Sequence, residues 1–216
     1  MEERHAAAGI SYRQEVLRKL IHLSSLWMVA AIMLIPQRWL TAAFFSVMLV
    51  LNLLVERAYS AGVPVVTPLF RFFFGRMIRR PPQAGQWVVT GSPPVWAAAA
   101  LVSILFPRPF AASALAAMLI GDTAAALIGR RFGRHKTFNG KSYEGVAAFI
   151  CAGFPAVLLV LQLCGALVRP LVWGALAGVV LAAVAELFEK QLHIDDNFSI
   201  PAVVGAVLTL VHWAAA

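Results

Sequence analysis

The chain has 216 residues, of which 61% are hydrophobic and only 13% are charged. An ordinary soluble domain carries about twice that share of charged residues, so the composition excludes a soluble globular protein and indicates an integral membrane protein. Lys and Arg outnumber Asp and Glu by 18 to 10, which gives a formal net charge of +8. We expect one polytopic membrane domain, residues 1–216, that is built entirely of α-helices.

The N-terminal residues 1–19 are basic, and we expect them to form an amphipathic arm at the membrane surface. Four polar residues then recur three and four positions apart, which places them on one face of a helix that enters the membrane. Their face is either a collar of snorkelling side chains or part of a functional site. A titratable ring just inside an apolar segment has little structural use, so His22 favours the second interpretation. The four residues are Glu15, Arg18, Lys19 and His22.

Apolar segments of nearly constant length fill most of the remaining chain. Each is close to the ~20 residues that cross a bilayer as a helix, so we expect about seven transmembrane helices. The third is the least regular, because Pro93 and Pro94 would bend or break it. The expected spans are 20–36, 39–55, 87–106, 110–129, 146–168, 171–188 and 199–214.

The distribution of the basic residues predicts how the spans are oriented in the membrane. With seven spans, only Arg38, Arg108 and Arg169 lie on the side opposite the N-terminus, and the positive-inside rule then places the N-terminus in the cytoplasm and the C-terminus outside. The net charge is therefore mainly a topology signal and an attraction to anionic lipid at the cytoplasmic face. We expect no nucleic-acid partner. The expected cytoplasmic segments are 1–19, 57–86, 130–145 and 189–198.

Two features belong to the expected cytoplasmic segment 57–86 or border it. Glu56 ends the second span, where it either joins an acidic cluster or pairs with the adjacent Arg57. Residues 70–80 read as an amphipathic interfacial segment that anchors the chain at the membrane surface.

The fourth span contains an acid inside its apolar run. Asp122, Ala125, Gly129 and Gly133 recur at helical spacing and form one smooth stripe. Such a stripe typically packs closely against another helix, which explains the glycines. It leaves Asp122 unpaired, and a carboxylate in a membrane span needs a metal ion, a cation or a proton.

A basic loop follows this span and indicates a phosphate site. It ends in Gly140-Lys141-Ser142, as a Walker A loop does, but the preceding Gly133 is two positions too early and no strand precedes it. The P-loop interpretation therefore fails. A cradle of side chains and backbone N–H groups remains, because a glycine-rich turn and a helix N-terminus both favour bound phosphate. Its expected members are Ala125, Gly129, Gly133, Arg130, Arg134, Lys141, Ser142 and Gly145.

The end of the sixth span and the loop after it add more acids. Glu186 lies in the span, and Asp195, Asp196 and Asn197 follow in the loop. Adjacent Asp residues often only cap a helix, and Asp196 or Asn197 could cap the seventh span. Carboxylates together with Asp122 also suit a hard cation such as Mg²⁺, and we favour a metal site formed by Asp122, Asp195, Asp196 and Glu186.

Three blocks together resemble the CTP-dependent lipid-alcohol kinases, the family of dolichol kinase, phytol kinase and the yeast-type diacylglycerol kinase. The first is E-x-x-R-K-x-x-H, from Glu15 to His22. The second is G-D-x-x-A-x-x-x-G-x-x-x-G from Gly121 to Gly133, followed by K-S-x-E-G from Lys141 to Gly145. The third is an acid followed by D-N-x-x-I-P, from Asp196 to Pro201. The blocks occur in the family's order along nearly the whole chain, and its small size is closest to phytol kinase and the bacterial members.

The resemblance implies phosphoryl transfer from CTP to the hydroxyl of a membrane lipid alcohol, with Mg²⁺ as the cofactor, in a bacterial cytoplasmic membrane with the site facing the cytoplasm. Either Asp122 or Glu144 would orient or deprotonate the hydroxyl, while Arg18, Lys19 and His22 neutralise charge. The lipid alcohol, CTP rather than ATP, and the oligomeric state, a homo-oligomer included, remain open. The alternatives are a CTP:phosphatidate cytidylyltransferase and, less favoured, a small membrane transporter with Asp122 and Glu186 as a relay.

Overall fold

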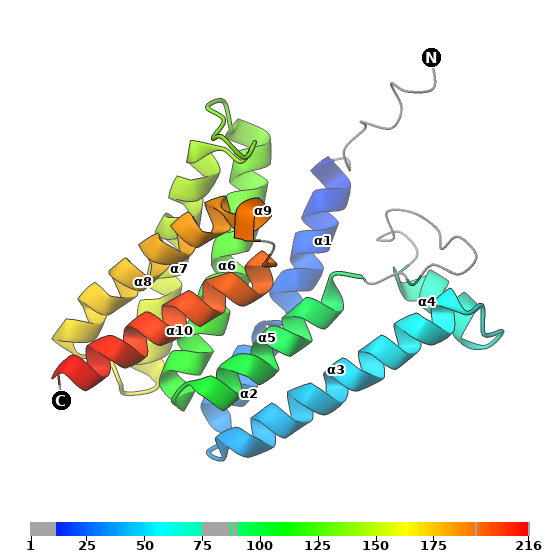
Figure 1. Ribbon diagram of the computed structural model, residues 1–216, viewed down its shortest axis with the longest axis horizontal. Coiled ribbons are helices and arrows are strands. Elements are labelled where there is room, and N and C mark those ends of the chain that lie inside the picture. The colour runs from blue at the N-terminus through cyan, green and yellow to red at the C-terminus, as the bar shows by residue number, and fades with distance from the viewer. Residues whose placement is uncertain (1–11, 75–86, 88–89, 193, 216) are drawn as a thin grey trace.

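The computed structural model describes residues 12–74, 87, 90–192 and 194–215. Every regular element in this part of the chain is an α-helix, as the composition predicts. The helices, shown in Figure 1, are α1 (Tyr12–Ser24), α2 (Leu26–Leu34), α3 (Arg38–Ser60), α4 (Val66–Phe74), α5 (Ser92–Leu105), α6 (Arg108–Phe132), α7 (Tyr143–Leu163), α8 (Arg169–Leu187), α9 (Glu189–Leu192) and α10 (Asp196–Ala215).

Six helical segments are long and apolar enough to cross a membrane. They correspond to six of the seven expected spans, and the chain is a multi-pass membrane protein. The first begins earlier than expected, because the described part of the N-terminal arm is helical and continues through α1 into α2. The six segments are Tyr12–Leu34, Arg38–Ser60, Arg108–Phe132, Tyr143–Leu163, Arg169–Leu187 and Asp196–Ala215.

The third expected span, 87–106, is the shorter helix α5 of 14 residues. Pro93 and Pro94 lie in its first turn, where a missing N–H group leaves no hydrogen bond unmade. The two prolines therefore start the helix instead of breaking it. At ~1.5 Å per residue the helix is shorter than a hydrocarbon core of ~30 Å.

Helix α5 nevertheless leads from one end of the bundle to the other. At its start, the backbone N–H of Thr90 donates to Glu56 near the end of α3. Beyond its end, the ring of Phe110 in α6 contacts the ring of His212 near the end of α10. The long helices and α5 thus alternate in direction, and the start of α1 and the end of α10 lie at opposite ends of the bundle (Figure 1). This alternation agrees with seven passes; which end faces the cytoplasm stays a prediction.

Helix α6 is the centre of the packing. It contacts α1, α2, α5, α7 and α10, and all residues from Ala111 to Leu119 are buried. Alanine fills much of this run, so the neighbouring helices approach closely. Asp122 follows one turn later and is thereby held inside the bundle at 8% exposure.

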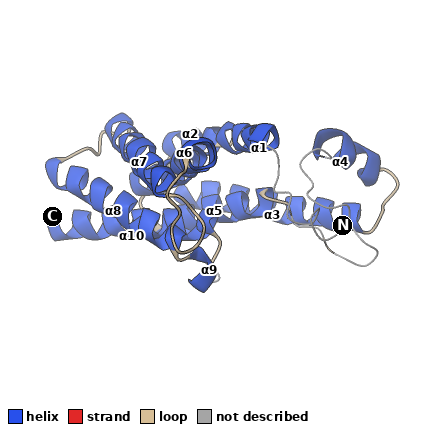
Figure 2. Cartoon of the chain, turned by 90° about the horizontal axis from the view of Figure 1, so that it is seen from above, coloured by secondary structure: helices blue, strands red, loops and turns tan. Residues whose placement is uncertain are grey.

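Helix α4 covers part of the expected interfacial segment 70–80, whose residues 75–80 lie outside the described part. The ring of Phe70 stacks on that of Tyr59 in α3 at 4.4 Å between centroids. Leu69 and Phe72 are exposed. Figure 2 shows α4 beside the end of α3, away from α7 and α8. A short helix with one anchored ring and exposed apolar residues is suited to a membrane surface.

Candidate functional site

Three carboxylates from three helices meet near one end of the bundle. They belong to Asp122 in α6, Glu186 in α8 and Asp196 at the start of α10, and each offers an oxygen atom within 4.8 Å of the other two. Asp122 and Glu186 are buried, whereas Asp196 is partly exposed. The structure therefore brings together three of the four acids expected at a metal site. An all-oxygen donor set of this kind suits a hard divalent cation.

Asp195, the fourth expected ligand, lies outside this carboxylate cluster. Its Oδ1 atom accepts hydrogen bonds from the backbone N–H of Asn197 at 2.9 Å and from the side-chain amide of Asn197 at 2.6 Å. The side chain is exposed and occupies the position that caps α10. The capping residue is therefore Asp195, and not Asp196 or Asn197 as the helix-cap alternative expected, while Asp196 belongs to the cluster.

Basic residues from α1 contact the cluster on one side. Lys19 donates to Asp122, and Nε2 of His22 lies 3.4 Å from Oδ2 of the same carboxylate. Lys19 is buried, and the side chain of His22 is 12% exposed. Lys19 and His22, on the face of α1 that the sequence singled out, thus contact Asp122, and a functional role for this face stays a prediction.

Arg18, on the same face, belongs to a neighbouring ion-pair group. Its guanidinium lies 2.6 Å from Glu15, and Arg130 in α6 contacts the other oxygen of Glu15 at 3.1 Å. Glu15 is buried between them. These ion pairs connect α1 to α6, and they hold Arg18 and Arg130 on Glu15 instead of on the carboxylate cluster.

Lys141 contacts the cluster from the opposite side. Its Nζ atom lies 2.9 Å from Glu186, 3.1 Å from Glu189 and 3.9 Å from Asp196. Partial burial alone would lower the pKa of Lys141, but the surrounding carboxylates, Glu186 first, raise it above its usual value. Lys141 is therefore a fixed positive charge at physiological pH.

The loop that carries Lys141 is held in a defined shape. Thr137 N–H donates to the carbonyl of Lys141 at 2.8 Å, and Tyr143 N–H donates to that of His135 at 3.0 Å. The tight turn between them uses Gly140 at φ 82°, which glycine adopts without strain. The amide of Asn139 reaches across to α8, where it donates to the carbonyl of Leu187. The loop is thereby fastened beside the helix that carries Glu186.

The small residues of the expected phosphate cradle form the contact between α6 and α7. A Cβ atom on Gly133 would lie 2.5 Å from Ser142 Oγ, and one on Gly129 would lie 2.9 Å from the same atom. A Cβ atom on Gly145 would lie 3.0 Å from the carbonyl oxygen of Ala125. The Ser142 hydroxyl is buried and caps α7 by accepting from the N–H of Gly145 at 3.1 Å. Close packing thus accounts for the glycines, and binding of phosphate by these residues stays a prediction.

Glu144 and Arg134 lie on the loop side of this contact. Glu144 accepts from the backbone N–H of His135 at 3.2 Å and pairs with its ring at 2.8 Å. Arg134 is exposed. Of the two acids considered as a base, only Asp122 belongs to the carboxylate cluster.

Two acids outside the expected site have positions that the sequence did not predict. Glu189 in α9 contacts Lys141; it follows Glu186 by three residues, and this helical spacing was the available signal.

Neither expectation for Glu56 holds: it is outside the carboxylate cluster, and its Oε1 atom accepts from Thr90. That partner is far away in sequence, and no local pattern indicates it.

Comparisons with known proteins leave the family open. No family model matches the chain, and no solved structure matches it. An uncharacterized protein of Rickettsia prowazekii (strain Madrid E) is 27% identical over 185 residues, which cover 85% of this chain and 88% of the relative. The likeness extends over nearly all of both chains and carries no information about activity.

Proposed function

We propose that this protein is a CTP-dependent kinase that phosphorylates the hydroxyl of a membrane lipid alcohol with the help of Mg²⁺. The observation that carries the proposal is the convergence of Asp122, Glu186 and Asp196 from three helices, with Lys19 and Lys141 on either side. Phosphoryl transfer depends mainly on positioning and charge neutralisation, and this arrangement offers both at one end of a membrane bundle. The three sequence blocks that resemble the lipid-alcohol kinases supply most of these residues.

The carboxylate cluster has the chemistry that a magnesium ion requires. Its three acids would hold the ion through oxygen atoms, and the surrounding bonds keep Asp122 and Glu186 inside the bundle. Bound Mg²⁺ would supply charge neutralisation to the triphosphate of the donor nucleotide.

Side chains of the protein would bind the phosphates, balance their charge and accept the hydroxyl proton. Lys141 would bind phosphate oxygens from the loop side, and Lys19 and His22 would balance negative charge from α1. The lipid oxygen forms a bond to the γ-phosphorus while the bond from that phosphorus to the β–γ bridging oxygen breaks. The hydroxyl proton passes to Asp122, and CDP leaves. Asp122 is favoured over Glu144 as the acceptor because only Asp122 belongs to the carboxylate cluster.

The proposal is tested with purified protein, Mg²⁺ and labelled nucleotide against phytol, a polyprenol and diacylglycerol. We expect the γ-label of CTP to appear in the lipid product, and parallel reactions with ATP establish the preferred donor. Incorporation of the α-label would instead indicate a cytidylyltransferase that transfers CMP. Absence of both labels with all three lipids, in protein shown to be folded, would contradict both enzyme proposals.

A further inference from the structure

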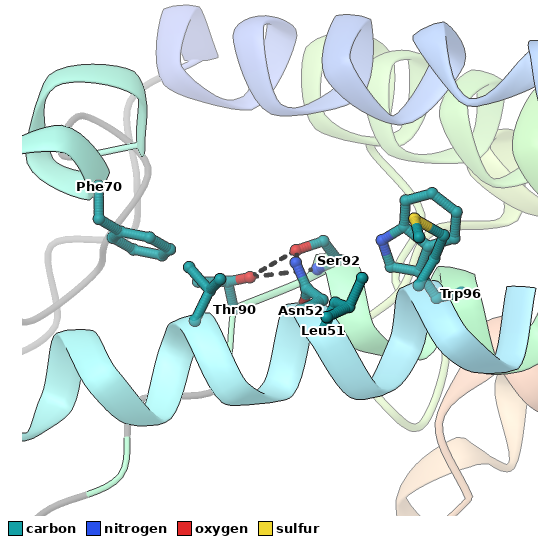
Figure 3. A pocket seen from close by; sticks show the side chains of 8 residues that line it. Leu51, Asn52, Phe70, Thr90, Ser92 and Trp96 are labelled. Atoms are coloured by element: carbon teal, nitrogen blue, oxygen red, sulfur yellow. Dashed lines mark hydrogen bonds between the residues drawn. The ribbon is translucent and has the colours of Figure 1, made fainter. Parts of the chain in front are cut away.

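A second set of polar side chains, separate from the carboxylate cluster, lies within the membrane-spanning part of the bundle. It adjoins a cavity of about 210 Å³ between α3, α4 and α5. Figure 3 shows Phe70 and Trp96 at opposite ends of the cavity, with Asn52, Thr90 and Ser92 between them. The remaining lining residues are apolar: Met48, Leu51 and Val55.

An acid stands behind the polar wall of this cavity. Glu56 is completely buried, and its Oε2 atom has no hydrogen-bond partner. Among the described residues no basic side chain forms an ion pair with it. An acid without a basic partner among the described residues is costly to keep inside a membrane span, and both hydrogen bonds from Thr90 go to its Oε1 atom.

Glu56 sets the direction of the hydrogen bonds that lead to the cavity. The Thr90 hydroxyl donates its single hydrogen to Glu56. Ser92, whose Oγ atom lies 2.8 Å from that of Thr90, is then the donor in their contact, because Thr90 has no second hydrogen to give. Ser92 Oγ also lies 3.4 Å from Oδ1 of Asn52, which is long for an O–H···O hydrogen bond. The lone pairs of Ser92 Oγ and the amide N–H groups of Asn52 are therefore left to meet a ligand.

A hydroxyl group is complementary to this wall, because it can donate to Ser92 and accept from Asn52. A phosphate monoester brings mainly acceptors, so it would face the lone pairs of Ser92 without receiving a hydrogen from it. Leu51 and Val55, in the same cavity, are exposed on the outer surface of α3, where acyl chains would surround a membrane helix. Ligand pockets commonly measure ~300–1,000 Å³, so this smaller cavity suits the end of one slim chain.

We propose that the cavity between α3, α4 and α5 binds the hydroxyl end of a single-chain membrane alcohol and rejects the phosphorylated form. The inference deepens the proposed function: it rests on that function for the fate of the alcohol, whereas the binding itself requires only the cavity. A site that retains an alcohol and releases its phosphate would supply substrate to a kinase and free the product.

The test uses hexadecanol that carries a diazirine near its hydroxyl, with the full-length protein in detergent and without nucleotide. We expect photolabelling of residues that line the cavity, with competition by unlabelled hexadecanol but not by hexadecyl phosphate. Equal competition by the phosphate, or stronger competition by hexadecylamine, would overturn the proposal. Labelling spread evenly over the outer surface of α3 would do the same.

Matched variants distinguish binding of the probe in the cavity from binding to the outer surface of α3. Val55→Trp, which fills the cavity, should reduce labelling about tenfold, as loss of a hydrogen-bonded ligand does. Leu54→Trp, on the same helix but outside the cavity, should not. Glu56→Gln should reduce the preference for the alcohol over the phosphate, because an amide N–H group can donate to Thr90 and so free the Ser92 hydrogen for an acceptor. Should Val55→Trp fail to fold, the competition experiment with the unaltered protein still decides.

The same preparations are assayed for transfer from γ-labelled CTP. Photolabelling of the cavity without any transfer would contradict the kinase and leave the alcohol site standing. Transfer that is unchanged in Val55→Trp, in a variant whose labelling is lost, would show that the cavity does not serve the kinase.

Discussion

Asp122 connects the basic residues of α1 with the carboxylate cluster. It contacts Lys19 and His22 of α1 and also belongs to the carboxylate cluster with Glu186 and Asp196. In the proposed mechanism this side chain both accepts the hydroxyl proton and binds the metal ion, so its loss should be more damaging than the loss of any neighbour.

We therefore expect Asp122→Asn to lower lipid phosphorylation by about 10²–10⁴-fold, the range for loss of an acid–base group. The amide retains the size of the side chain but not its charge, so expression and membrane insertion should persist. The control is Thr123→Val in the same turn, because the Thr123 hydroxyl bonds only to the carbonyl of Leu119. Full activity in Asp122→Asn would contradict the proposed role.

Adjacent acids provide a second test at this scale. Asp196→Asn should raise the Mg²⁺ concentration needed for half-maximal activity at least about tenfold, because one ligand of three is weakened. Asp195→Asn should leave it nearly unchanged, since Asp195 caps α10. Thermal stabilisation by Mg²⁺ without nucleotide gives an independent readout. Equal effects of the two substitutions would show that the carboxylate cluster is not the metal site.

At the scale of elements, the contact of α6 with α7 determines where Lys141 lies. The two helices meet through Gly129, Gly133 and Gly145, with the Ser142 hydroxyl between them. Small residues permit this approach. The turn above it then directs Lys141 toward α8.

Gly129→Ala should lower the free energy of unfolding by about 1–3 kcal/mol, the usual cost of overfilling a packed contact. The added Cβ atom would lie 2.9 Å from Ser142 Oγ and 3.3 Å from the Gly145 Cα atom, so backbone must move. Gly153→Ala is the control, because its nearest contact would be an ordinary 3.4 Å to Val179. Thermal unfolding in detergent measures both, and equal melting temperatures would show that the contact has room to adjust.

At the scale of the whole molecule, the alternation of helices predicts that the loop before α7 and the end of α10 lie on opposite sides of the membrane. Three membrane-spanning helices, α7, α8 and α10, separate these two points. Together with the positive-inside rule, this separation leads us to expect the loop in the cytoplasm and the C-terminus outside.

A reporter enzyme that is active only outside the cytoplasmic membrane checks this orientation. Alkaline phosphatase fused after Gly140 should be inactive, and the same enzyme fused after Ala216 should be active. The reversed pattern would show the opposite orientation. Equal activity at both positions would contradict an odd number of passes between them.

Much of the architecture was predictable because helix formation and membrane insertion depend on local sequence. Apolar length located all six long helices, and the position of Asp122 inside a span marked it as a candidate site residue. The prediction was less accurate at 87–106, where Pro93 and Pro94 start α5. The effect of a proline depends on whether it lies in the first turn or in the interior of a helix, and that boundary was not evident from the apolar run.

The sequence by itself determined the helices, the membrane class and the set of acids and bases available for a site, because these follow from composition and from spacing within one helix. Only the tertiary structure decided which acids meet. In it, Asp196 lies with Asp122 and Glu186, whereas Asp195 caps a helix. Glu56 accepts a hydrogen bond from Thr90. Contacts between helices depend on how each helix is rotated and crossed against its neighbours, and spacing within one chain segment does not contain that information.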